Sequence, residues 1–203
     1  MGKRACLAKA EIVACLWHSL PMAQKATVCK AALRIADIDR GLYADHHLTL
    51  ARHPSENDER MMIRLLAFAL CVPADDHGGA LEFAKGMWDP DEPELWQKDL
   101  TGQLLQWIEV GQPEERRLVK ASGRAKRVSV FAFSHGAPLW WSGLSGRVAR
   151  ARNIEAWLVP SEQSRALAEL AGRSMQLQIG RQDGSIWVAD GERSVEIGLT
   201  RLQ

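Results

Sequence analysis

The chain has 203 residues, with 26 Lys and Arg against 25 Asp and Glu, for a formal net charge of +1 at pH 7. Hydrophobic residues make up 46 % and charged residues 25 %, which is typical of a globular domain and excludes disorder of the whole chain. No uncharged apolar run reaches about 18 residues, so no transmembrane helix is expected. Because the net charge is near neutral, any attraction to nucleic acid or to a membrane should be local.

The N-terminal residues resemble a secretory signal only superficially, because Lys9 and Glu11 interrupt the apolar stretch. We expect residues 1–21 to be a poorly ordered extension and residues 22–203 to form a single α/β domain. The cysteines stand at positions Cys6, Cys15, Cys29 and Cys71. Their spacing fits neither a C-x-x-C pair nor a zinc finger, so we expect free thiols in a reducing cytoplasm. Nothing in the sequence indicates an oligomer, and a monomer is expected.

Apolar and polar residues alternate over 26–36, which predicts a half-buried strand. Turn residues at 37–41 and a second alternating run over 46–52 complete a predicted hairpin. Ser55 is then the expected N-cap of a helix that ends near Cys71, before Pro73. Within that helix, Glu59 is expected to point toward the buried side.

Strands and helices alternate through the rest of the chain. The expected elements are a strand over 81–85, a helical turn over 94–98, a strand over 103–110, a helix over 114–125, a strand over 127–133, a strand over 154–159 and a helix over 161–173. The strand–helix–strand order predicts a parallel pair with a right-handed crossover. Asp183-Gly184 and Asp190-Gly191 predict tight turns between two or three antiparallel C-terminal strands. The expected fold class is therefore α/β, a mixed sheet flanked by helices with added hairpins.

Three acidic residues stand in apolar or strand-edge settings: Glu59 in the helix, Asp99 beside a strand, and Glu109 inside an apolar strand near Trp107. A carboxylate in such a setting is costly unless it is protonated, paired or bound to a cation. Converging carboxylates suit a hard divalent cation such as Mg²⁺, which can activate water and stabilise a phosphoryl transition state. The alternative is that Glu109 only pairs with a nearby arginine.

Several long strings in this chain resemble the bacterial YaeQ family. They are Arg52–Phe68, Asp91–Gly102, Trp107–Ala121, Gln182–Val188 and Val195–Thr200. The resemblance covers roughly residues 22–203 and implies a variant of the PD-(D/E)XK nuclease fold. In that superfamily, an acid on a helix, an Asp on one strand and an acid-x-Lys motif on the next together hold Mg²⁺ or Mn²⁺ for phosphodiester cleavage.

Carried over by residue, the resemblance implies that Glu59, Asp99 and Glu109 hold the metal. The sequence departs from the motif at Gly111, where the lysine should stand. Lys120 on the following helix is the expected substitute, provided that this helix packs back over the strand end. The missing lysine puts cleavage in doubt, and Asp89 and Asp91 compete with Asp99 for the strand position.

Basic residues offer a path for a phosphate backbone. Arg116, Lys120 and Arg124 recur at every fourth position of the predicted helix. The neighbouring basic residues are Arg117, Lys126, Arg127, Arg147, Arg150 and Arg152. Such a stripe could neutralise phosphates without reading bases, and the alternative is an ordinary solvated helix face.

Two functions follow from these observations. The first is a Mg²⁺- or Mn²⁺-dependent nuclease acting on DNA or RNA, with Glu59, Asp99, Glu109 and Lys120 as its site. The second is a non-catalytic protein of the same fold that binds nucleic acid or protein, and Gly111 favours this second hypothesis.

Overall fold

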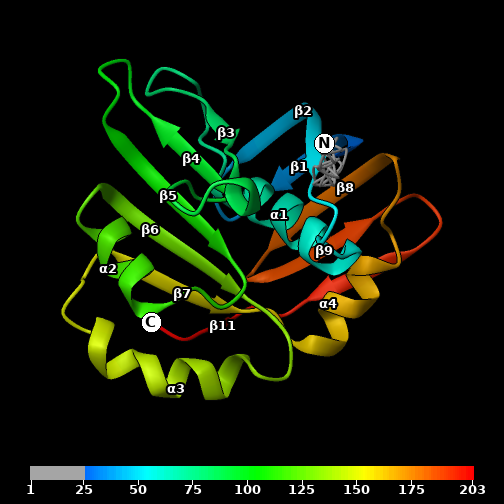
Figure 1. The fold of residues 1–203 in the computed structure, drawn as a ribbon. Coiled ribbons are helices and arrows are strands. Elements are labelled where there is room, and N and C mark those ends of the chain that lie inside the picture. The colour runs from blue at the N-terminus through cyan, green and yellow to red at the C-terminus, as the bar shows by residue number, and fades with distance from the viewer. Residues whose placement is uncertain (1–25) are drawn as a thin grey trace, which may run out of the picture.

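The computed structural model describes residues 26–203, so the predicted N-terminal extension lies outside the described residues. Two β-sheets enclose one helix. The first sheet has the strand order β10-β9-β8-β1-β2, and the second has the order β11-β7-β6-β5-β4-β3. Figure 1 shows helix α1 lying between the two sheets, with α2 and α3 on the far side of the second sheet. Among residues 26–203, no helix is long and apolar enough to cross a membrane.

The first sheet begins with the predicted hairpin. β1 (Thr27–Asp37) pairs antiparallel with β2 (Leu42–Arg52), in a register that places Thr27 opposite Arg52. The C-terminal strands β8 (Ser174–Gln182), β9 (Ser185–Ala189) and β10 (Ser194–Ile197) form the rest, joined by the two predicted Asp-Gly turns. β8 lies parallel to β1, so strands from the first and the last parts of the described chain share this sheet, whereas the final strand belongs to the second sheet.

Helix α1 (Asp58–Cys71) forms the centre of the larger core. Ten of its 14 residues are buried, because apolar side chains surround the helix and both sheets pack on it. Its N-cap is Asn57, whose side chain accepts a hydrogen bond from the backbone of Arg60 at 2.9 Å, so the prediction of Ser55 as the cap is wrong. The helix ends one residue before Val72, as the Pro73 position predicted.

The second sheet carries the predicted parallel strand pair. It consists of β3 (Leu81–Phe83), β4 (Leu95–Lys98), β5 (Leu104–Val110), β6 (Ala125–Ala132), β7 (Ile154–Leu158) and β11 (Thr200–Arg201). β5 and β6 run parallel and are connected by α2 (Glu115–Ser122), which confirms the predicted parallel pair. Within the segment 94–98, predicted as a helical turn, residues 95–98 instead form β4, whose backbone pairs with strands on both sides.

The remaining helices complete the layers. A short 3₁₀ helix, η1 (Gly86–Trp88), precedes β4. Helix α3 (Ala137–Val148) was not expected from the sequence, and it packs with α2 on a second core built around Trp107. Helix α4 (Ser161–Ala168) is five residues shorter than predicted, and no side chain caps its N-terminus.

Candidate functional site

A pocket of about 280 Å³ opens at the carboxyl end of β5. Its charged lining comes from four side chains, Arg60, Glu94, Glu109 and Arg117. Because β5 and β6 are parallel, their carboxyl ends share this edge of the sheet, which is where open α/β sheets bind ligands. The position therefore makes this pocket the first place to look for a functional site.

Glu109 sits at the bottom of this pocket and is only 3 % exposed. Its Oε1 accepts two hydrogen bonds, from Trp107 Nε1 at 2.7 Å and from Arg117 Nε at 2.6 Å. Burial raises the pKa of the Glu109 carboxyl above its ordinary value, and the Arg117 guanidinium opposes that rise. The alternative stated from the sequence, that Glu109 pairs with an arginine, is confirmed.

The second acid of the pocket is Glu94, which the sequence analysis did not single out. It is 2 % exposed and lies directly before β4. Arg60 donates to its Oε1, and Arg64 Nε lies 3.1 Å from its Oε2. Arg64 in turn donates to Glu56 at 2.9 Å, so the pocket continues inward as a buried ion network. The prediction of a helical turn over 94–98 gave no reason to expect Glu94 in the site. An acid directly before an apolar strand is the sequence signal that could have identified it.

The backbone conformation and surroundings of Gly111 explain why the motif lysine is absent at this position. Its φ of +99° lies in the left-handed region that favours glycine. A Cβ at this position would stand 2.8 Å from Arg60 Nη1, which also donates to the carbonyl of Val110 at 2.6 Å. The Arg60 guanidinium thus fills the space into which a side chain at 111 would extend. Lys120, the predicted substitute, instead forms an ion pair with Asp91 on the outer surface.

The other two predicted metal ligands lie elsewhere. Glu59 accepts a hydrogen bond at 2.5 Å from the hydroxyl of Ser164 on α4. Asp99 closes the turn between β4 and β5, where its Oδ1 accepts from both Thr101 and Gln103. These bonds, led by the one from the Thr101 hydroxyl, lower the pKa of Asp99.

The structure does not bring Asp99 to Glu109. Asp99 lies opposite Gln103, at the amino end of β5, while Glu109 lies near the carboxyl end. Six strand residues at about 3.3 Å each separate the two ends by roughly 20 Å. One ion cannot bind both side chains.

With the partners that they have in the structure, the side chains of this pocket do not form a site for Mg²⁺ or Mn²⁺. Such an ion needs several carboxylate or carbonyl oxygens that are free to bind it. Within residues 26–203, no three His, Cys, Asp or Glu side chains gather so that they could hold a metal. The three carboxylates of the network are matched by three guanidinium groups, on Arg60, Arg64 and Arg117. This balance leaves no excess negative charge to attract a cation.

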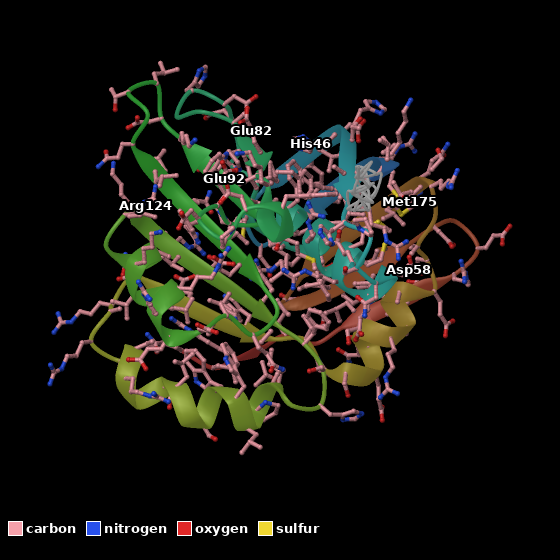
Figure 2. All side chains as sticks on the ribbon, in the orientation of Figure 1. His46, Asp58, Glu82, Glu92, Arg124 and Met175 are labelled. Carbon is pink, nitrogen blue, oxygen red and sulfur yellow. The ribbon has the colours of Figure 1, made fainter. Side chains whose placement is uncertain are left out.

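The basic residues divide into two groups. Arg117, Lys120, Arg127 and Arg147 each form an ion pair with an acid of the described chain. The other five have no acidic partner within 4.0 Å among residues 26–203: Arg116, Arg124, Lys126, Arg150 and Arg152. Figure 2 shows Arg124 on the opposite side of the molecule from Asp58, which begins α1.

Asn153 fixes the position of the segment that carries Arg150 and Arg152. Its side-chain amide donates to the carbonyls of Ser122 and Ala125, at 3.0 and 2.9 Å, and accepts from the Ser122 hydroxyl. The segment that carries Arg150 and Arg152 is therefore fixed beside the end of α2 and the start of β6. We call the resulting set of six exposed cations the basic surface, made of Arg116, Lys120, Arg124, Lys126, Arg150 and Arg152.

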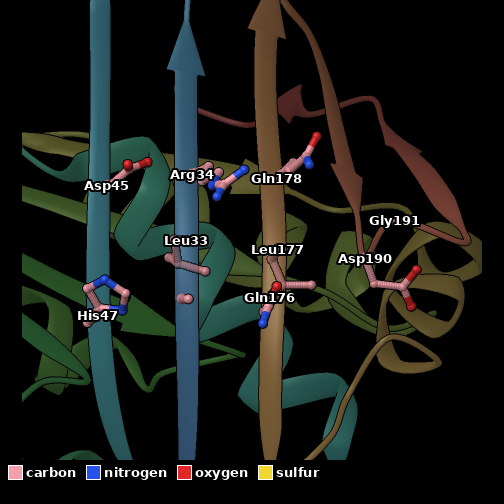
Figure 3. A pocket seen from close by; sticks show the side chains of 10 residues that line it. Leu33, Arg34, Asp45, His47, Gln176, Leu177, Gln178, Asp190 and Gly191 are labelled. Atoms are coloured by element: carbon pink, nitrogen blue, oxygen red, sulfur yellow. The ribbon is translucent and has the colours of Figure 1, made fainter.

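A larger hollow, of about 340 Å³, lies on the outer face of the first sheet. Figure 3 shows His47 of β2, Arg34 of β1 and Gln178 of β8 along this face. None of the predicted site residues lines it. His46, the neighbour of His47, faces inward against Phe68 with ring centroids 5.1 Å apart, so the two histidines point to opposite faces of the sheet.

These features define a mixed α/β protein with a buried helix between two sheets, an ion-paired pocket and a separate basic surface. A family model described as YaeQ protein matches residues 22–199, and the chain belongs to the YaeQ family.

Individual YaeQ proteins are similar to this chain over most of its length. The YaeQ protein of Salmonella typhi is 43 % identical over 183 residues, which cover 90 % of this chain and 98 % of that protein. The Escherichia coli K12 protein is 41 % identical with the same coverage. The crystal structure of YaeQ from Xanthomonas axonopodis pv. citri matches with a TM-score of 0.82 at 42 % identity, covering 88 % of this chain and 99 % of that one. The Pseudomonas syringae structure also gives 0.82, at 35 % identity, with coverages of 89 % and 98 %.

Proposed function

We propose that this chain is a cytoplasmic protein with a PD-(D/E)XK nuclease-like fold that binds the phosphate backbone of nucleic acid and does not cleave it. The observation that carries the proposal is the basic surface, on which five of six exposed cations have no acidic partner among the described residues. The order α1, β4, β5, α2, β6 agrees with the nuclease-like order that the family resemblance implies. The two free, buried thiols, Cys29 and Cys71, agree with a reducing compartment.

The arrangement of the basic surface suits a phosphate backbone. Arg116 and Lys120 lie one helical turn apart on α2, which corresponds to about 6 Å at 1.5 Å per residue, whereas Arg124 follows the end of α2 at Ser122, because the helix is shorter than the predicted range of 114–125. Lys120 is paired with Asp91, but both side chains are exposed, at 49 % and 72 %. Exposed pairs of this kind contribute only about 0–1 kcal/mol, so Lys120 can exchange its partner for a phosphate. Binding of this type neutralises phosphates and carries no sequence readout.

Cleavage with a divalent ion is the second candidate. It is favoured by one observation, that Glu94 and Glu109 line the same pocket at the carboxyl edge of the parallel strands. Both acids already form ion pairs with arginines, and Arg60 fills the space next to Gly111. A metal would first have to displace these partners, so we favour binding without cleavage.

Charge reversal on the basic surface tests the proposal. The variant Arg124→Glu/Arg152→Glu changes two exposed cations, and Lys30→Glu/Arg34→Glu makes the same charge change on the outer face of the first sheet. Fluorescence anisotropy would follow binding to a labelled DNA duplex and to a labelled single-stranded RNA. We expect the first variant to weaken binding at least tenfold and the control to change it less than about threefold. Equal losses in both variants, or wild-type affinity in the first, would overturn the proposal.

A further inference from the structure

A second cavity, of about 210 Å³, lies between the two sheets at the C-terminal end of α1. Its lining comes from the last turn of α1, from β6 and β7, and from the β8–β9 hairpin. It shares no residue with the pocket of Glu94 and Glu109 or with the basic surface. The proposed nucleic-acid binding leaves this cavity without a role.

Most of the wall is apolar. It is formed by Leu70, Phe131, Trp157, Ile186 and Leu199. An enclosed space with aromatic and aliphatic walls and a few polar groups is typical of a small-molecule site. The volume is below the roughly 300 Å³ at which drug-sized ligands are held, so a ligand here must be smaller.

One polar group inside the cavity lacks a partner. Ser129 is 1 % exposed and lines the cavity, and its hydroxyl has no hydrogen-bond partner among residues 26–203. A buried hydroxyl without a partner is costly, and native structures rarely leave one unexplained. The neighbouring group is the Cys71 thiol, a weak acceptor whose pKa burial raises to about 11, so it carries no charge near neutral pH. Sulfur is a poor acceptor, so a ligand oxygen would be a better partner for the Ser129 hydroxyl than the Cys71 thiol beside it.

Two arginines line the same cavity. Arg181 lies 3.2 Å from Asp39 and 3.7 Å from Asp37, and both distances exceed the usual 2.7–2.9 Å of a charge-assisted hydrogen bond. The 3.2 Å contact joins Arg181 Nε to Asp39 Oδ2, so this Nε is ion-paired, although it makes no well-aligned hydrogen bond among the described residues. Arg127 is half-exposed and bonds to a single oxygen of Glu155. Both guanidinium groups retain donors that an incoming anion can use.

From this geometry we infer that the cavity binds a small monocarboxylate with an apolar body. The carboxylate would accept hydrogen bonds from Ser129 and from the guanidinium of Arg181 or Arg127, whose planar donors match two oxygens. The aliphatic or aromatic body would lie against Trp157 and its apolar neighbours. A ligand of this site must have both the carboxylate and the apolar body. This requirement distinguishes the site from one that binds any anion and from one that binds any apolar molecule.

The test uses hexanoate and benzoate as probes, with hexanamide and benzyl alcohol as neutral matches. Saturation-transfer NMR and calorimetry on the full chain would measure binding. Ser129→Leu places a larger apolar side chain in the cavity and should abolish carboxylate binding. Arg181→Gln removes one cation and should weaken binding about tenfold, whereas Arg34→Gln, at an exposed arginine on the outer face of the first sheet, should leave it unchanged.

The inference requires that carboxylates bind with a millimolar or lower Kd and that the neutral matches bind at least tenfold more weakly. It is overturned if neither carboxylate binds, if the neutral probes bind equally well, or if folded Ser129→Leu binds like the wild type. Should Ser129→Leu fail to fold, Arg181→Gln decides the question, because an unchanged Kd in that variant also contradicts the inference.

Discussion

The ion pair between Glu109 and Arg117 allows a direct test of whether this acid stabilises the fold. We compare Glu109→Ala with Glu109→Gln. Alanine removes the acceptor that serves both Trp107 Nε1 and Arg117 Nε, whereas glutamine keeps an oxygen in the same place and removes only the charge.

The structure sets the size of the expected effect. Removing one partner of a buried ion pair typically costs about 3–5 kcal/mol. Arg117 is 24 % exposed and also donates to the carbonyls of Pro90 and Glu92, so we expect the lower end, about 3 kcal/mol, for Glu109→Ala. Burial outweighs the effect of the arginine and raises the pKa of Glu109, so folding favours the protonated form over the charged form. Glu109→Gln should therefore change the free energy of unfolding by no more than about 1 kcal/mol.

The same pKa direction predicts a pH dependence. Because the folded-state pKa of Glu109 is raised, the folded protein binds this proton more tightly than the unfolded chain does. The wild type should lose stability relative to Glu109→Gln as the pH rises from the ordinary value of 4.5 through the folded-state pKa.

Urea unfolding of the three proteins across this pH range measures both effects. A loss of 3 kcal/mol corresponds to a fall in Tm of about 6–12 °C for a chain of this size. An alanine variant as stable as the wild type, or a glutamine variant as unstable as the alanine variant, would refute the reasoning.

Three further predictions concern other positions. Restoring the motif lysine by Gly111→Lys should destabilise the protein by about 1–3 kcal/mol, because the left-handed backbone is strained for lysine and Arg60 fills the space, and a wild-type urea midpoint would contradict this. Calorimetric titration of Mn²⁺ and Mg²⁺ should show no saturable binding; saturable binding that Glu109→Gln abolishes would instead favour the metal-dependent alternative. Hydrogen bonds led by the backbone N–H of Arg193 lower the pKa of Asp190 to about 2, so its contribution to stability is present above pH 3.8 and is lost as the pH falls toward 2. The gap in Tm between the wild type and Asp190→Ala should close over that range, and a gap that persists at the acid end would count against this assignment.

Local patterns predicted most of the elements. Alternating residues and Asp-Gly turns identified the strands of the first sheet, since hairpin pairing depends on neighbouring residues. The parallel pairing of β1 with β8 was not visible, because it joins Lys30 to Ser174, far along the chain. Helix α3 was missed although its buried residues, Ala137, Trp141, Leu144 and Val148, recur at helical spacing. Its glycines and adjacent tryptophans obscured that period.

The candidate site was predictable only in part. The apolar neighbours of Glu109 correctly indicated a buried acid, and the structure has the arginine pair that was stated as the alternative to metal binding. Sequence could not show that Asp99 is held in its own turn, because a residue beside a strand end can lie at either edge of a sheet. Nor could it show that Arg60, fifty residues earlier, reaches Val110 and fills the space beside Gly111. Tertiary packing, rather than local spacing, decides which charges meet.

The central claim is that the basic surface binds a phosphate backbone. The most direct measurement is the affinity of the wild-type protein for a DNA duplex over a series of salt concentrations. Six phosphate contacts at about 0.9 each predict that log K falls against log salt with a slope of about −5.4, and that Arg124→Glu/Arg152→Glu makes the slope shallower by about 2. An affinity independent of salt, or no binding at the lowest salt concentration, would contradict the claim.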